Sequence, residues 1–164
     1  MYPGADENAS AVAVILEIAR LWHELDFQPK RTVVFAALDA NGGFQFVNHS
    51  PFPVSTSDTW TIVSLEGLGA SQDELAQAGT GPGLARTFDQ SARRFDLRTT
   101  PLNTWRFFLA GSGSADQVYS GIAITRPGDD RSGTSTDTID HLDPTSFGHI
   151  GSAIAHYLML LSTR

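Results

Sequence analysis

Residues 32–38 read Thr-Val-Val-Phe-Ala-Ala-Leu, a continuous run of β-branched, aromatic and small apolar side chains. A half-exposed strand would alternate apolar and polar positions, so an unbroken run indicates a strand that is buried on both faces. Strands of this kind belong to parallel sheets whose faces are covered by helices. This stretch therefore predicts an α/β fold.

Two amphipathic helices are predicted on either side of this run. Between residues 9 and 25, the spacing of three and four predicts one buried stripe, formed by Val12, Ile15, Leu16, Ala19, Trp22 and His23. Asn8 or Ser10 can cap this helix by accepting a backbone N–H. The last helix is expected over residues 144–161, with Pro144 in its first turn. Its buried stripe would be Phe147, Ile150, Ile154, Leu158 and Leu161.

Further elements are predicted between these helices. Strands are expected over residues 60–65 and 121–125, and a helix over residues 83–95. The stretch 127–138 is rich in Gly, Ser, Thr and Asp and is expected to form a loop. Strands that alternate with helices imply a three-layer sandwich, in which helices flank a mostly parallel central sheet. No repeat or linker interrupts the chain, so we expect a single domain over residues 1–164.

Composition and charge restrict the class of function. Hydrophobic residues make up 41% of the chain and charged residues 18%, which favours a packed core over disorder. The net charge of -7 argues against a nucleic-acid ligand, because such binding depends on clustered Lys and Arg. The absence of cysteine excludes disulfides and thiolate metal ligands. No apolar run reaches the roughly 18 residues of a membrane span, and the start of the chain does not read as a signal peptide.

Carboxylates follow the predicted strands and precede the first helix. In open α/β sheets, ligands bind beyond the carboxyl ends of the strands, where Asp39 and Glu66 stand. Residues 4–10, Gly-Ala-Asp-Glu-Asn-Ala-Ser, add Asp6 and Glu7 at the start of the first helix. Acidic side chains there can equally serve only to stabilise the helix dipole, by roughly 0.3–1 kcal/mol. Composition alone leaves both interpretations open.

The order of the segments resembles the zinc aminopeptidases of metallopeptidase family 28, whose fold glutamate carboxypeptidases and glutaminyl cyclases share. The similarity lies in residues 4–10, the helix that follows them and the strand 32–38. It continues through Val-Ser-Leu-Glu-Gly-Leu-Gly at 63–69 and Asp-Thr-Ile-Asp-His-Leu-Asp-Pro at 137–144. The resemblance covers nearly the whole chain. It implies a reduced, zinc-exopeptidase-like fold that lacks the family's N-terminal strands, as in a chain shortened from a longer protein.

The resemblance also implies a site for two zinc ions bridged by a carboxylate, with a separate Glu as general base. The bridging carboxylate would be Glu7, and Glu66 would be a second carboxylate ligand; the family usually has Asp at both positions. The extra methylene displaces each carboxylate by roughly 1 Å, whereas metal–ligand distances tolerate about 0.2 Å. Both side chains remain candidate metal ligands.

Several positions depart from the family pattern. Asn41 occupies the general-base position and Gly42 that of a Glu ligand, and an Asn side chain cannot accept a proton at neutral pH. Residues 115–117, Ala-Asp-Gln, stand where the family has Ser-Asp-His, and Gly133 replaces the final His ligand. The family's first His ligand would precede Met1. We therefore expect no catalytic residue and no cofactor, and an inactive peptidase-like domain that serves as a binding or assembly module.

The alternative is an active metallo-aminopeptidase or hydrolase with a rearranged or single metal site. Zinc would then be held by Glu7, Glu66 and His141, because His141 lies beside the altered final motif. His23 fits a packed core position better than a ligand position. His49 is a weaker candidate ligand, whereas His149 and His156, on the last helix, are expected to point outward or to cap neighbouring groups. No Gly-x-Ser-x-Gly elbow indicates a serine nucleophile.

The missing strands also bear on partners. A shortened sheet exposes unpaired backbone groups, and such edges pair with other chains. We therefore expect either self-association, or a partner protein or segment, or a compact reduced sheet. A peptide-like ligand fits the family resemblance, whereas nucleic acid does not.

Overall fold

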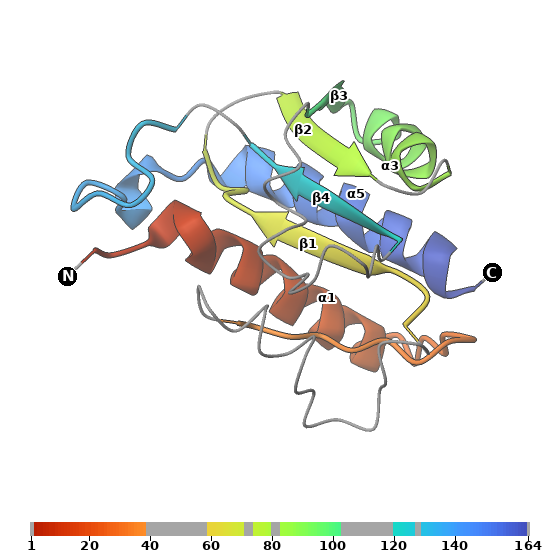
Figure 1. Cartoon of the computed structure of the whole chain (residues 1–164). Helices are drawn as coiled ribbons and strands as arrows, with labels where there is room; N and C mark the ends of the chain where they lie inside the picture. Colours follow the sequence, from red (N-terminus) through yellow and green to blue (C-terminus); the bar gives the residue numbers. More distant parts are fainter. Residues whose placement is uncertain are drawn as a thin grey trace.

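The computed structural model of the chain describes residues 2–38, 59–70, 74–79, 83–102, 120–126 and 129–163. Its elements are α1 (Ala11–Glu24), β1 (Ile62–Glu66), β2 (Glu74–Gly79), α3 (Leu84–Arg93), β3 (Arg98–Pro101), β4 (Gly121–Thr125) and α5 (Pro144–Ser162). Two short helical segments, η1 (Ala5–Ser10) and η3 (Ile139–His141), lead into α1 and α5. Figure 1 shows the strands lying in one sheet beside the three longer helices.

The sheet has four described strands in the order β1-β4-β2-β3. β1 pairs with β4 in parallel, from Ile62 opposite Gly121 to Glu66 opposite Thr125, and β2 pairs with β3 in parallel. Only the β2–β4 pair is antiparallel. β4 is buried along its whole length, as its unbroken apolar sequence requires. The predicted α/β fold with a mostly parallel sheet is thus confirmed.

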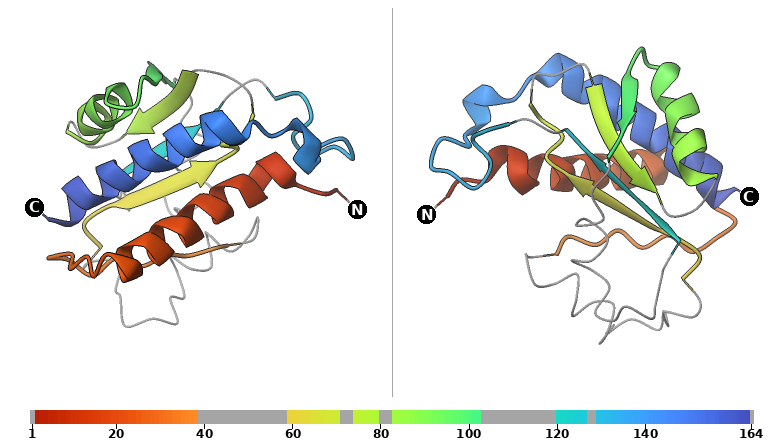
Figure 2. Two further views of the ribbon diagram at one scale, coloured as in Figure 1. Left: turned by 180° about the vertical axis from the view of Figure 1, so that it is seen from behind. Right: turned by 45° about the horizontal axis from the view of Figure 1, so that its top comes forward.

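The helices α1, α3 and α5 lie on one side of the sheet (Figure 2). α5 supplies Ile150, Ile154 and Leu161 to the core, and its partly buried Phe147 and Leu158 pack against the same cluster, as predicted. Its first turn is built as expected, because Pro144 follows Asp143, whose Oδ1 accepts the Thr145 N–H. The described residues therefore supply the sheet and one helical layer of the expected sandwich. None of their helices is long and apolar enough to cross a bilayer.

Trp22 of the predicted α1 stripe is buried as expected, but the rest of the predicted stripe is displaced by about one residue. The buried positions are Ala11, Val14, Ile18 and Trp22, whereas Leu16 is 64% exposed and His23 is exposed. The rings of Phe27 and Phe35 pack on Trp22 at centroid distances of 4.7 and 5.6 Å, which fixes the rotation of the helix. Nearly every position of α1 is apolar in its first two turns, so spacing alone could not fix that rotation.

The run at 32–38 is extended but forms no strand of the described sheet. Val33 and Phe35 pack against the core, while Val34 and Leu38 are 42% and 47% exposed. The run therefore has one buried face instead of two, and β1 is an edge of the described sheet. Sequence reasoning also missed β2 and β3, which are short and carry no regular alternation of apolar and polar residues.

Candidate functional site

The carboxylate of Asp137, in the loop before α5, binds the backbone of η1. Its Oδ1 accepts the backbone N–H of Asp6 at 2.6 Å, and its Oδ2 accepts that of Glu7 at 3.1 Å. The Asp137 carbonyl also accepts the Ala5 N–H at 3.2 Å. Asp137 is only 2% exposed, so these donors compensate for the loss of water around its charge. Asp137 is therefore committed to holding the backbone.

Asp6 and Ser10 join η1 to the loop that follows β1. The Asp6 Oδ1 accepts the Gly69 N–H at 2.5 Å, and Asp6 is 2% exposed. The Ser10 hydroxyl donates to the Asp6 carbonyl at 2.6 Å and accepts the Leu68 N–H at 2.9 Å. The Ser10 hydroxyl makes no capping bond to the first turn of α1 and instead binds the Leu68 N–H after β1. The prediction that Ser10 caps α1 is thus wrong.

Asn8 does not cap α1 either. Its side-chain Nδ2 donates to the Leu65 carbonyl at 3.1 Å, and its Oδ1 accepts the Gly67 N–H at 3.3 Å. Both partners are neighbours of Glu66 at the carboxyl end of β1. Asn8 therefore connects η1 to the strand end on both sides of Glu66, a role that helix-capping rules do not reveal.

The two sequence-predicted carboxylates, Glu7 and Glu66, face the same end of the sheet. Glu66 is half-buried, and burial raises its pKa because the charged form loses solvation. A 3.4 Å hydrogen bond from the Ser64 hydroxyl opposes that shift, and the negative charge of Glu7 adds to it. The Glu7 side chain is exposed. The two carboxylates therefore lie close enough for the charge of one to act on the other, and we call this pair the Glu7–Glu66 site.

Arg131 adds a positive charge to this region that sequence reasoning missed. Its Nε and Nη2 donate to the Asp129 carboxylate at 2.7 and 3.1 Å. These bonds are the main cause of the raised pKa of Arg131, and the charges of Asp6 and Asp137 raise it further. The sequence signal that could have identified Arg131 was its position shortly before Gly133, where the family motif is altered. His141 is exposed at the end of η3 and contributes, after Arg131, to the lowered pKa of Asp129.

Gly133, which stands where the family has its last His ligand, is exposed in the loop before η3. Its φ of +71° lies in the left-handed region, which glycine adopts more readily than other residues. A Cβ built on Gly133 would meet no heavy atom within 4 Å. Asp39, Asn41, Gly42 and residues 115–117 lie outside the described residues.

The described side chains do not fit the two-zinc site that the family resemblance implies. Both oxygens of Asp137 and one oxygen of Asp6 accept backbone N–H groups. Of the predicted ligands, Glu7 and Glu66 remain near the carboxyl end of β1, and His141 is exposed at the end of η3, whereas a zinc site takes three or four protein donors gathered in one place. Within the described part of the chain, no three His, Cys, Asp or Glu side chains gather where they could hold a metal ion.

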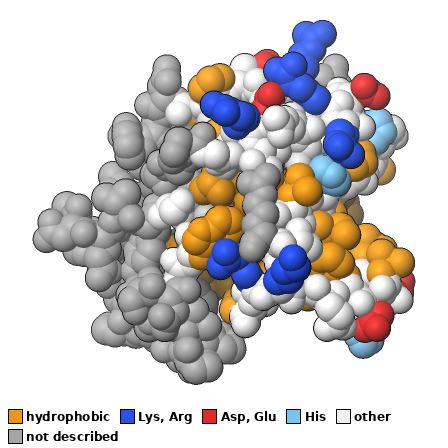
Figure 3. Space-filling view, turned by 90° about the vertical axis from the view of Figure 1, so that its right-hand side faces the viewer, with side chains coloured by type: hydrophobic (Ala, Val, Ile, Leu, Met, Phe, Trp, Pro, Cys, Tyr) orange, Lys and Arg blue, Asp and Glu red, His pale blue; other side chains and the backbone are white. Residues whose placement is uncertain are grey.

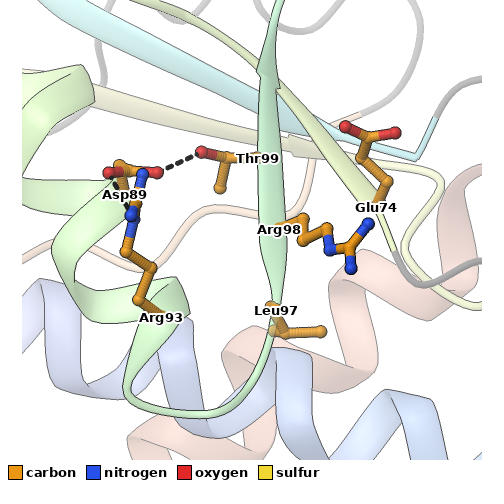
Figure 4. Close-up of a pocket in the computed structure, with 6 residues that line it drawn as sticks. All are labelled: Glu74, Asp89, Arg93, Leu97, Arg98 and Thr99. Carbon is orange, nitrogen blue, oxygen red and sulfur yellow. Dashed lines mark hydrogen bonds and ion pairs between the residues drawn. The ribbon is translucent and has the colours of Figure 1, made fainter.

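A separate cavity of about 320 Å³ lies between α3 and β3, lined by Glu74, Asp89, Arg93, Leu97, Arg98 and Thr99. The Asp89 carboxylate accepts the Thr99 hydroxyl at 2.7 Å and the Arg93 Nε at 2.9 Å (Figure 4). Figure 4 also shows Arg98 pointing toward Glu74 on the other side of β3. Asp89 is already bound by Arg93 and Thr99, so the Glu7–Glu66 site remains the better candidate.

Comparison with known proteins is consistent with this geometry. Residues 1–158 match the pattern of peptidase family M28. The fold is similar to a zinc aminopeptidase from Bacillus subtilis (TM-score 0.79, 17% identity, covering 99% of this chain and 43% of that one). It is also similar to an aminopeptidase from Aneurinibacillus sp. strain AM-1 (0.74, 18%, 99% and 40%) and to the γ-secretase component nicastrin (0.77, 14%, 97% and 37%). The chain thus spans less than half the length of each of these proteins.

Proposed function

We propose that this chain, which belongs to peptidase family M28, is a catalytically inactive, peptidase-like domain that serves as a binding or assembly module. One observation carries the proposal. Asp6 and Asp137 hold backbone N–H groups, which leaves Glu7 and Glu66 as the two carboxylates of the site that bind no backbone N–H group in the described residues. Two carboxylates suit at best a weakly held, hydrated cation rather than two zinc ions.

The sequence departures support the same proposal from separate positions. Asn41 stands at the general-base position, so no side chain there takes a proton from a water molecule. Gly42 and Gly133 replace two further ligands. These positions are far apart in the chain, so one shift in alignment does not account for all of them.

The surface supports a role in assembly. The Arg31 guanidinium lies 4.5 Å from the centroid of the Trp60 ring, and Trp60 and Ile62 at the start of β1 are 44% and 37% exposed. Figure 3 shows a face on which apolar side chains lie among basic ones. Nicastrin, a protein of similar fold, is named as a component of γ-secretase. We therefore propose self-association, or a protein segment or peptide-like chain, as the partner class.

Metal content and hydrolysis test the proposal together. The purified chain is expected to carry well below one zinc ion per molecule by elemental analysis, and to leave aminoacyl-nitroanilides unhydrolysed with zinc added. Light scattering then tests for self-association. A monomer with no affinity for any partner would count against an assembly role.

The alternative is an active hydrolase with a rearranged or single metal site, favoured by the proximity of the Glu7 and Glu66 charges. It predicts stoichiometric zinc and hydrolysis, both lost in Glu7→Gln, Glu66→Gln and His141→Ala variants but kept in a Glu24→Gln control on the outer face of α1. That pattern would overturn the inactive assignment. Loss in the two Glu variants but not in His141→Ala would keep the enzyme but remove His141 from its site.

A further inference from the structure

The backbone on either side of Glu66 is bound by a side chain rather than by a strand. β1 pairs with β4 on one edge, where the Ile62 N–H donates to the Ser120 carbonyl at 3.1 Å. Successive residues of a strand direct their backbone groups to opposite edges. The Leu65 carbonyl and the Gly67 N–H bond instead to the side chain of Asn8, at 3.1 and 3.3 Å.

This bonding pattern is the one a parallel strand would make. In a parallel ladder, one residue of the partner strand donates to the carbonyl before the paired residue and accepts the N–H after it. The side-chain amide of Asn8 supplies one donor and one acceptor in a plane, like a peptide group. It therefore stands where a strand residue paired with Glu66 would stand.

We propose that Asn8 is the positioning residue of the Glu7–Glu66 site, because its amide fixes the strand end that carries Glu66 to the segment that carries Glu7. Glu7 precedes Asn8 directly, and the Glu7 N–H is held from the other side by Asp137 Oδ2. The separation of the two glutamates is thus set by side-chain-to-backbone hydrogen bonds. The inference rests on the proposed function only in taking Glu7 and Glu66 as the carboxylates of the site that do not bind backbone N–H groups.

The chemistry of position 8 selects Asn. An ionised Asp keeps the acceptor for the Gly67 N–H but has no donor for the Leu65 carbonyl, and its oxygen repels that carbonyl. A Ser hydroxyl has a single hydrogen on a shorter arm and does not span both groups. A protonated Asp regains both functions, since its O–H donates and its other oxygen accepts.

Hydrogen exchange and NMR on the Asn8→Ala variant test the inference without any ligand. The Gly67 amide is expected to exchange about three- to tenfold faster than in the parent, as expected for the loss of one hydrogen bond. The carbon shift of the Leu65 carbonyl should change with it, and a crystal structure of the variant should show an altered Glu7–Glu66 separation. A Gln28→Ala control, which removes an exposed amide bonded to Asp26, should change none of these.

Asn8→Asp provides a second test if the Ala variant does not fold. Its Gly67 and Leu65 signals should differ from the parent at pH 7 and return toward the parent values once the new carboxyl group is protonated, near pH 4. Unchanged Gly67 exchange in a folded Asn8→Ala variant would overturn the proposal. So would changed exchange with an unchanged Glu7–Glu66 separation, since Asn8 would then be a stabilising contact only. Both outcomes are independent of zinc content and hydrolysis, so the proposed function can fail while this inference stands.

Discussion

The Asp137 carboxylate accepts the backbone N–H of Asp6 at 2.6 Å, although the two residues lie 131 positions apart in the sequence. Asp6 in turn accepts the Gly69 N–H through its own carboxylate. Two buried acids thus connect three segments, each acid binding the backbone of the next. The backbone around the Glu7–Glu66 site is therefore held by hydrogen bonds to buried carboxylates.

Asp137→Asn is expected to destabilise the fold by about 2–3 kcal/mol. The amide keeps one acceptor oxygen, while its NH2 group meets the N–H of Asp6 or of Glu7, donor against donor. Urea unfolding followed by circular dichroism measures the change. Asp130→Asn, at an exposed position in the same loop, should stay within about 0.5 kcal/mol of the parent. Equal stability of the two variants would contradict a structural role for the Asp137 charge.

Gly69→Ala is expected to cost about 1–3 kcal/mol through overpacking. A Cβ at this position would lie 2.5 Å from Leu142 Cδ2 and 3.1 Å from Asp6 Oδ1. Leu142 can rotate away, but Asp6 is held by the Gly69 N–H itself. Thermal unfolding should therefore show a lower Tm. Gly151→Ala in α5, where a Cβ meets nothing within 4 Å, should instead be neutral or stabilising, because Ala favours helix.

Local patterns predicted those elements whose apolar residues lie in the core. The strand over residues 121–125 and the helix from Pro144 appear nearly as predicted, because their apolar residues are buried. The run at 32–38 was expected to be buried on both faces, yet only alternate residues, Val33 and Phe35, reach the core. Local composition does not reveal which neighbour covers each face of a strand.

The motif predicted which residues to inspect but not how they are connected. It placed Glu7 and Glu66 as candidate ligands, and in the structure the charge of Glu7 acts on Glu66, while their role as ligands stays a prediction. The bonds of Asn8 and Ser10 to the end of β1 were not predictable, because helix-capping rules consider only contacts within one helix. Long-range bonds from side chain to backbone leave no periodic signal in a sequence.

Glu66→Gln is expected to stabilise the protein at neutral pH. The folded pKa of Glu66 is raised, chiefly by burial, so the folded state holds its proton more tightly than the unfolded chain. The stability of the parent that depends on Glu66 is fully present below the unfolded pKa and is lost as the pH rises through the folded pKa. Urea unfolding from pH 3.5 to 8 should show this loss in the parent and a flatter profile in Glu66→Gln. A Glu74→Gln variant, at an exposed position on β2, serves as the control. A parent profile that rises through this range and is unaltered by Glu66→Gln would contradict the assignment.

The substitution Gly133→His tests whether the Glu7–Glu66 site can regain a metal ligand. The φ of +71° penalises any side chain with a Cβ, so Gly133→His and Gly133→Ala should both lose about 1 kcal/mol of stability. The surrounding space is open, so neither variant should add a steric clash. One imidazole does not replace the missing general base and the remaining ligands. Zinc should therefore not raise the Tm of Gly133→His more than that of Gly133→Ala, and neither variant should hydrolyse an aminoacyl-nitroanilide. The opposite outcome is that zinc raises the Tm of Gly133→His alone. If adding Glu66→Gln abolished that rise, the Glu7–Glu66 site would be shown to bind metal.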